Sequence, residues 1–293
     1  MSPLIQVRDL TRVYRRPRTS LTGGRHSVVA LRDVSLDIQA GERFGIVGES
    51  GSGKSTLIRL LAGLDQPTSG SILFDGHEIA GAPERKLGFL RRQLQFVFQD
   101  PMGSLDPRMR VRHIVAEPLV AQGHPNPAQR VDELLEAVGL SPAAADRFPH
   151  QFSGGQRQRI SIARALAPQP TVLVADEPVS ALDVSVRAQI LNLLLDLAEE
   201  FSLTLIFVSH DLAVVRRICD NVGVLHHGEL VEHGPTRQLY DQPRHAYTRR
   251  LVAAVPTIRK ALSGVDAEEL ARGVLSAGAD PTDDPEEKAA LES

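Results

Sequence analysis

The sequence predicts an α/β protein whose core is a mainly parallel sheet. Short apolar runs typical of buried strands alternate along the chain with segments of helical periodicity. The run 44–47 stops at Gly48 and is followed by a helical segment, 55–62, which is the order of a strand, a tight turn and a helix. The runs 172–175 and 203–208 are likewise followed by helical segments. This repeated order favours parallel strands joined by helical crossovers.

The N-terminal part adds further strands to this pattern. Residues 4–10 alternate loosely between apolar and polar side chains, and residues 34–38 alternate with period two, as a half-buried strand does. Residues 17–27, rich in Arg, Thr and Gly, are expected to form a loop. Segments 70–74 and 94–98 are also expected to be strands.

The middle of the chain is mainly helical. Helical periodicity dominates residues 110–167, with breaks at Pro and Gly, so the block between 99 and 171 is expected to be an inserted subdomain. The elements expected after it are helices 184–201 and 212–218 and a hairpin of strands 222–225 and 229–232. Residues 281–293 are polar and acidic and are expected to be disordered.

Composition excludes several classes of protein. A single cysteine, Cys219, among 293 residues excludes a disulfide scaffold and a multi-cysteine metal or iron–sulfur site. The apolar runs are far shorter than the ~20 residues that span a bilayer, and the N-terminus lacks a signal-peptide pattern, so a cytoplasmic protein is expected. Residues 266–293 carry nine acidic and two basic residues, and the slight basic excess elsewhere is too weak for a polynucleotide-binding surface.

A phosphate-binding loop is predicted between the strand 44–47 and the helix 55–62. The residues from Gly48 to Thr56 match G-x-x-x-x-G-K-[ST], and the glycines let backbone N–H groups point at phosphate oxygens. Lys54 would reach the β- and γ-phosphates, and the Ser55 hydroxyl would bind Mg²⁺. The alternative is a flexible Gly/Ser turn, but this loop holds one of only four lysines in an arginine-rich chain, where a compact ammonium fits.

Two carboxylates follow the apolar run 172–175. Ligands bind at the carboxyl ends of strands in open α/β sheets, so Asp176 and Glu177 are expected to face the phosphates. Asp176 suits Mg²⁺, and Glu177 could polarise the attacking water as a general base. The alternative, a solvated strand end, is disfavoured by the presence of the phosphate loop.

A serine–glycine motif, F-S-G-G-Q-R-Q-R, occupies residues 152–159. Taken alone, it is either an anion site or a plain helix cap. It resembles the signature motif of the ATP-binding cassette (ABC) ATPases, usually LSGGQ, with Phe152 in place of Leu. The phosphate loop, Gln99, this motif, Asp176–Glu177, the residues S-A-L-D at 180–183 and His210 follow one another in the order of an ABC cassette, over about residues 4–256.

The resemblance implies a fold and a role for each motif. The fold would be the P-loop NTPase ABC cassette, with a RecA-like core, an N-terminal antiparallel β subdomain and an inserted helical subdomain at about 100–167. Tyr14 would stack on adenine, Gln99 would contact Mg²⁺ or the water, and His210 would contact the γ-phosphate. Catalysis would fall to Glu177, His210, Gln99 and Lys54, and Mg²⁺ would be bound by Ser55, Gln99 and Asp176. The residues implied in nucleotide binding are Tyr14, Gly48, Glu49, Ser50, Gly51, Ser52, Gly53, Lys54, Ser55, Thr56, Gln99, Ser153, Gly154, Gly155, Gln156, Asp183 and His210.

Two cassettes face head to tail in this family, which assigns some residues to a partner's site. Ser153, Gly154, Gly155 and Gln156 would act on the nucleotide held by the second cassette, and Asp183 would lie at the seam. A lone chain should therefore be a poor ATPase, because half of each site is missing.

A finer resemblance concerns the oligopeptide and dipeptide importers. The segment Q-D-P-M-G-S-L-D-P-R-M from Gln99 is similar to their Q-loop region, and residues 231–256 look like their C-terminal extension, which begins at about 234. The domains implied are a cassette over 1–256, including the extension over about 234–256, and an acidic tail over 257–293. Many members carry a cysteine cluster in the extension, but Cys219 stands alone here.

The function implied is that of an ATP-hydrolysing subunit at the cytoplasmic face of the inner membrane. It would act with integral membrane permease subunits, a second cassette and, indirectly, an extracytoplasmic solute-binding protein, and it would not bind nucleic acid. Peptides are the expected cargo, with nickel or glutathione as the alternatives. An ABC ATPase of DNA repair or chromosome maintenance would carry long coiled coils or zinc modules between the motifs, and a small-metabolite kinase would leave the signature unexplained.

Overall fold

The computed structural model describes residues 2–15, 27–124 and 127–254. The chain divides into two units, 1–252 and 253–293. The elements below belong to the first unit, except that the last helix runs two residues beyond it. The predicted loop at 17–27 lies almost entirely outside the described residues, and the predicted acidic tail at 257–293 lies outside them completely.

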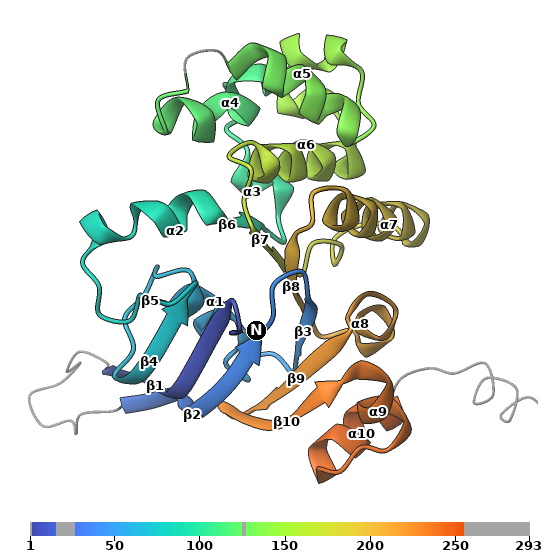
Figure 1. Ribbon diagram of the computed structural model, residues 1–293. Helices are drawn as coiled ribbons and strands as arrows, with labels where there is room; N and C mark the ends of the chain where they lie inside the picture. Colours follow the sequence, from blue (N-terminus) through green and yellow to red (C-terminus); the bar gives the residue numbers. More distant parts are fainter. Residues whose placement is uncertain (1, 16–26, 125–126, 255–293) are drawn as a thin grey trace, which may run out of the picture. The chain divides into compact units, whose positions relative to one another are not determined.

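An antiparallel sheet forms the N-terminal part, in the order β2-β1-β4-β5 (Figure 1). Its strands are β1 (Ile5–Arg15), β2 (Ser27–Ile38), β4 (Ser69–Phe74) and β5 (His77–Glu78). The first two are longer than predicted because they pair along their whole length, from Ile5 opposite Ile38 to Arg15 opposite Ser27. Irregularities in the ladder break the alternation of side chains that a period-two search depends on.

The central sheet has six strands in the order β10-β9-β3-β8-β7-β6. They are β3 (Arg43–Val47), β6 (Leu94–Val97), β7 (Val172–Asp176), β8 (Thr204–Ser209), β9 (Asn221–His226) and β10 (Glu229–Pro235). Every neighbouring pair is parallel except the predicted hairpin of β9 and β10. These pairings confirm the prediction of a mainly parallel sheet, and the apolar side chains of β3, β7 and β8 are buried in it.

Helices pack around the central sheet and also form a separate group. Those connected directly with the sheets are α1 (Lys54–Leu61), α2 (Gly88–Gln93), α7 (Val184–Glu200), α8 (Leu212–Ile218), α9 (Thr236–Asp241) and α10 (Ala246–Ala254). The separate group, drawn above the sheets in Figure 1, contains α3 (Pro101–Ser104), α4 (Val111–Ala121), α5 (Pro127–Ala137) and α6 (Gly154–Leu166). Single 3₁₀ turns occur at η1 (Glu84–Lys86), η2 (Pro142–Asp146) and η3 (Pro149–Gln151).

The helical group has its own packed interior, as expected for an insertion at about 100–167. Helix α4 buries Val111, Ile114 and Leu119 where it lies against α5 and α6. Two arginines near its start pair with one carboxylate: Arg110 and Arg112 lie 3.3 and 2.5 Å from Asp146. Within the described ranges, no helix is both long and apolar enough to cross a membrane.

Candidate nucleotide-binding site

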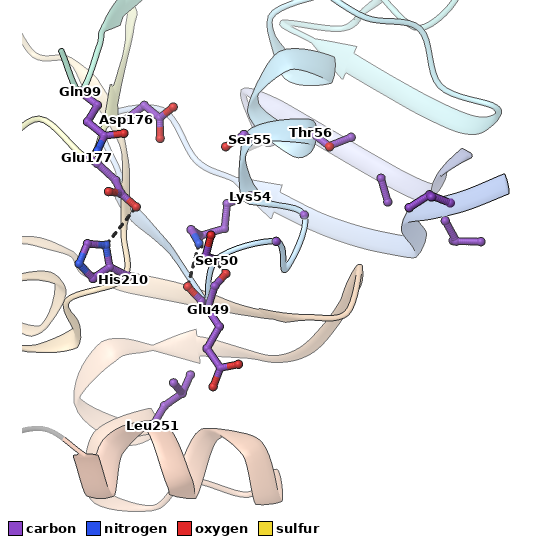
Figure 2. Close-up of a pocket in the computed structure, with 16 residues that line it drawn as sticks. Glu49, Ser50, Lys54, Ser55, Thr56, Gln99, Asp176, Glu177, His210 and Leu251 are labelled. Atoms are coloured by element: carbon purple, nitrogen blue, oxygen red, sulfur yellow. Dashed lines mark hydrogen bonds and ion pairs between the residues drawn. The ribbon is translucent and has the colours of Figure 1, made fainter. Parts of the chain in front are cut away.

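The phosphate loop lies between β3 and α1, in the predicted context (Figure 2). At Gly48 the backbone has a φ of 154°, and a Cβ there would overlap the carbonyl oxygen of Leu225, so this position requires glycine. The Lys54 ammonium donates to the carbonyl oxygens of Gly48 and Glu49, at 2.7 and 2.9 Å. The loop thus curls around its own lysine. The N–H group of Glu49 donates to Tyr247 and that of Ser52 donates to the Glu49 carbonyl, and the other N–H groups of the loop are suited to a phosphate ligand.

Charges on the facing strand end balance this lysine. Burial lowers the pKa of Lys54, whereas the carboxylates of Glu177 and Asp176 act in the opposite direction. Burial, followed by the charge of Glu177, raises the pKa of Asp176, and Lys54 opposes that rise. Asp176 is therefore a carboxylate that would gain from a nearby cation, and it lines the same pocket as the Ser55 hydroxyl. Carboxylate, hydroxyl and amide oxygens are the donors that Mg²⁺ prefers, so these residues fit that ion.

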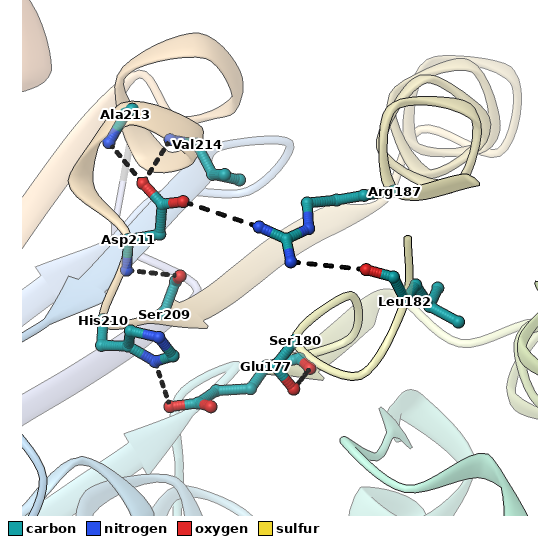
Figure 3. A network of polar contacts seen from close by, with 9 residues as sticks. All are labelled: Glu177, Ser180, Leu182, Arg187, Ser209, His210, Asp211, Ala213 and Val214. Carbon is teal, nitrogen blue, oxygen red and sulfur yellow. Dashed lines mark hydrogen bonds and ion pairs between the residues drawn. The ribbon is translucent and has the colours of Figure 1, made fainter. Parts of the chain in front are cut away.

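Glu177 and His210 face each other across the end of the central sheet (Figures 2 and 3). The Nδ1 atom of His210 lies 3.1 Å from a carboxylate oxygen of Glu177. Glu177 has a φ of 46°, which is uncommon for a residue with a side chain, and its N–H donates to the Val208 carbonyl at 3.0 Å. The Ser180 hydroxyl donates to the Glu177 carbonyl at 3.1 Å. The glutamate is therefore held on both sides of its Cα as β7 ends.

A second set of contacts links this corner to α7 (Figure 3). The Asp211 carboxylate accepts the N–H groups of Ala213 and Val214, which caps α8 next to His210. Arg187 of α7 lies 4.0 Å from Asp211 and donates to the Leu182 carbonyl at 3.4 Å. Arg187 thus links the segment before α7 to Asp211, the residue that follows His210.

One pocket collects most of the predicted residues. Those that line it are Gly48, Glu49, Ser50, Gly51, Gly53, Lys54, Ser55, Thr56, Gln99, Asp176, Glu177 and His210. Ser52 is buried instead, and its carbonyl accepts the N–H of Gly228 at 2.9 Å. Val28, Val29, Ala30 and Leu251 also line the pocket, and sequence reasoning did not single them out because they belong to no polar motif.

Tyr14 lies in a different hollow of the surface. It borders that hollow together with Arg12 and Thr68, and it is not among the residues around the phosphate loop. Its hydroxyl donates to the Asp65 carboxylate at 2.6 Å, and the Arg12 guanidinium lies 4.5 Å from its ring centre. Tyr14 therefore does not line the pocket in this structure, and its assignment to adenine binding stays a prediction.

The serine–glycine motif forms the N-terminus of α6, outside the pocket lining. Ser153 and Gln156 cap the helix reciprocally: each backbone N–H donates to the other's side chain, at 3.0 and 3.3 Å. Ser153, Gly154 and Gln156 are exposed, as is Asp183 at the start of α7. Gly155 is buried, and a Cβ there would overlap a methyl group of Val186 in α7. The two exposed helix starts are thus in close contact with each other.

Asp176→Asn is expected to stabilise the protein in the absence of nucleotide. Folding raises the pKa of this carboxyl above its ordinary value of 3.8, so the ionised carboxylate lowers the free energy of unfolding. This loss disappears at a pH at which the carboxyl is protonated in both the folded and the unfolded protein. The unfolding midpoint of the variant should exceed that of the wild type by about 2 °C at pH 7. The difference should shrink towards zero as the pH falls to about 3. Thermal unfolding without nucleotide or divalent cation measures it, and a lower midpoint at pH 7 would contradict the expectation.

Comparisons with known proteins agree with this geometry. The model of the ABC transporter family matches residues 31–180, and that of the oligopeptide/dipeptide transporter C-terminal region matches residues 231–277. The di/tripeptide transport ATP-binding protein DppF of Pseudomonas aeruginosa is 48% identical over 261 residues, which are 88% of this chain and 80% of DppF. The oligopeptide transport ATP-binding protein AppF of Bacillus subtilis is 49% identical, over 87% of this chain and 78% of AppF.

A third relative is longer than this chain. The glutathione import ATP-binding protein GsiA of Escherichia coli is 50% identical over 257 residues, which are 87% of this chain but 41% of GsiA. Among solved structures, a dimeric post-hydrolysis state of the cassette MJ0796 with ADP and Pi is 32% identical, with a TM-score of 0.68 over 80% of this chain and 99% of that one. The structure of cbiO1 from Clostridium perfringens, part of the ABC transporter complex cbiONQ, is 29% identical, with a TM-score of 0.72 over 90% and 100% of the two chains.

Proposed function

Because the chain belongs to the ABC transporter family and is one of its ATPase cassettes, we propose that it hydrolyses ATP as one half of a cassette dimer and thereby drives peptide import through a membrane permease. The observation that carries this proposal is the common pocket of Lys54, Gln99, Asp176, Glu177 and His210. These residues come from four separate segments of the chain and supply a cation, two carboxylates, an amide and an imidazole to one site.

Each group in the pocket has a task suited to its chemistry. The phosphate loop binds the phosphates through its N–H groups and the Lys54 ammonium. Ser55, Gln99 and Asp176 would hold Mg²⁺, which neutralises developing charge on the phosphates. Glu177 accepts a proton from the attacking water, and His210, 3.1 Å from it, orients that carboxylate and faces the γ-phosphate.

The second half of the site is proposed to come from another cassette. Ser153, Gly154 and Gln156 are exposed at the start of α6 and do not line this chain's own pocket. The positive N-terminal end of a helix and a serine hydroxyl are suited to covering a phosphate held by a partner. Asp183 and Val184, which is 81% exposed, would lie at the seam. The solved relative MJ0796 is a dimeric cassette, which supports this arrangement.

Ser153→Arg is expected to act on the partner's site and not on its own. In a mixed dimer, a Ser153→Arg chain paired with a Lys54→Ala chain has both defects at one composite site and leaves the other composite site intact. That dimer should keep about half of the wild-type turnover, whereas dimers of either variant alone should lose it. Tagged co-expression, tandem purification and an ATPase assay with the permease test this. Equal loss in all three dimers would contradict a shared site.

The cargo is proposed to be di- or oligopeptides. The C-terminal match at 231–277 is to the oligopeptide/dipeptide transporter group, and the names of DppF and AppF refer to di/tripeptide and oligopeptide transport. Glutathione is the second candidate, because GsiA is 50% identical over nearly the same span. Glutathione is itself a tripeptide, so the two candidates share peptide bonds and a free carboxylate.

Uptake measurements distinguish these cargoes. Deletion of the gene in its source organism should abolish uptake of a labelled dipeptide or oligopeptide and leave glutathione uptake unchanged. Wild-type protein should restore uptake, and the Glu177→Gln variant should not. Loss of glutathione uptake alone would favour the second candidate, and no change in either would refute import of both.

The location and remaining partners follow from the proposed role. The chain would bind integral permease subunits at the cytoplasmic face of the inner membrane. A solute-binding protein outside the cell would deliver cargo to those permeases without touching this subunit. Membrane fractionation of cells with and without the permease genes tests the attachment.

A further inference from the structure

A tyrosine of the C-terminal extension, to which the sequence analysis gave no role in the site, contacts the phosphate loop. The backbone N–H of Glu49 donates a hydrogen bond of 3.0 Å to the hydroxyl oxygen of Tyr247, 198 residues later in the chain. Tyr247 lies in α10 and is 2% exposed. Burial raises the pKa of Tyr247, so the hydroxyl remains neutral at physiological pH. The contact is therefore a stable hydrogen bond between a buried side chain and the loop.

The ring of Tyr247 is fixed by a neighbour that also belongs to the loop's surroundings. It stacks on His226, with ring centres 3.9 Å apart and an angle of 29° between the planes. His226 ends β9, and the turn that follows contacts the loop again, because the Gly228 N–H donates to Ser52. The tyrosine and this turn thus support the loop together.

The helix that carries Tyr247 is anchored just before it begins. The carboxylate of Glu232 in β10 accepts the backbone N–H groups of Arg244 and His245, both at 2.9 Å. Burial opposes ionisation of Glu232, but these N–H donors outweigh it and lower its pKa. The start of α10 is therefore attached to the central sheet through an ionised carboxylate.

The Tyr247 bond and the Lys54 bond act on one peptide group. The N–H of Glu49 and the carbonyl of Gly48 belong to the same planar unit. Its carbonyl end accepts the Lys54 ammonium at 2.7 Å, and its N–H end is held by the Tyr247 hydroxyl. Rotation of this peptide plane would move the acceptor that aims Lys54. Leu251, one turn further along α10, lines the pocket beside it (Figure 2).

We propose that Tyr247 is a positioning residue for nucleotide binding: its hydroxyl fixes the Gly48–Glu49 peptide plane and, through it, the Lys54 ammonium. The C-terminal helix α10 is then part of the ATP site and not only an appendage of the cassette. The inference rests on the proposed function of the loop in binding ATP.

Tyr247→Phe tests it in the full-length chain, because it keeps the ring and the stack on His226 and removes only the hydroxyl. We expect the Kd for ATP to rise about fivefold, the effect of one lost neutral hydrogen bond. Hydrogen exchange of the Glu49 amide should also become faster. Isothermal titration and exchange mass spectrometry measure the two effects. A wild-type Kd together with unchanged exchange at Glu49 would overturn the proposal.

Tyr240→Phe is the matched control. Its hydroxyl is also buried and donates to a backbone carbonyl, that of Leu212, but it does not contact the phosphate loop. It should lower the unfolding midpoint and leave the Kd for ATP unchanged. If Tyr240→Phe raised the Kd for ATP as much as Tyr247→Phe does, the effect would reflect a general loss of stability and the proposal would fail. Lys54→Ala distinguishes failure of the Tyr247 proposal from failure of the proposed function. If Lys54→Ala bound ATP normally, the loop would not be the ATP site and the proposed function itself would fail.

Discussion

Lys54→Ala is expected to weaken ATP binding at least about 100-fold and to abolish measurable turnover, because it removes a buried, charged donor to the phosphates. The lysine is 7% exposed, and its ammonium is held by the two carbonyl groups at the start of the loop. Burial lowers its pKa while the facing carboxylates oppose that shift, so its charge is kept for a ligand at a cost to the unliganded fold. Titration with ATP and a phosphate-release assay measure the two losses.

The matched control for this variant is Lys86→Ala. Lys86 is one of the four lysines and is exposed in η1, far along the chain from the loop. It should bind ATP with wild-type affinity. If Lys54→Ala retained an affinity within about threefold of the wild type, corresponding to less than one hydrogen bond, the loop would not be the phosphate site.

Glu177→Gln is expected to separate binding from chemistry. The amide has the shape of the carboxylate and can still pair with His210, but it cannot accept a proton from water. Turnover should fall about 100- to 10,000-fold, the usual contribution of a general base, while the Kd for ATP changes little. Because hydrolysis would no longer reopen the dimer, ATP should shift the protein to a dimeric species in light scattering.

Glu200→Gln makes the same change of charge at an exposed position at the end of α7. It should hydrolyse ATP at the wild-type rate and show no ATP-dependent dimer accumulation. Normal turnover by Glu177→Gln in the assembled transporter would refute the general-base assignment. A large rise in its Kd would instead place Glu177 in binding.

The parts of the site that could be predicted are the motifs whose functional residues lie close together in the sequence at a fixed spacing. The phosphate loop and the Asp176–Glu177 pair follow directly from strands whose apolar runs are short and uninterrupted. Gln99 and His210 were proposed from the order of motifs, and both line the pocket. The parallel sheet brings these segments together because the carboxyl ends of β3, β7 and β8 share one edge.

Contacts that depend on docking between distant segments were not predictable. Tyr247 was expected only as a residue of the C-terminal extension at 231–256, and no local pattern indicated that its hydroxyl would meet Glu49. Val28 and Val29 lie between the predicted loop at 17–27 and the predicted strand at 34–38 and were given no role, although they line the pocket and are 46% and 39% exposed. The hydroxyl of Tyr14 likewise donates to Asp65, a residue 51 positions away, and no local pattern indicated that contact.

The absence of a side chain at Gly155 has a mechanical consequence. The first turn of α6 lies so close to the stiff, branched side chain of Val186 in α7 that a Cβ at position 155 would overlap a Val186 methyl group. The substitution Gly155→Ala would therefore have to push the starts of α6 and α7 apart, which would move the exposed residues that both helix starts present.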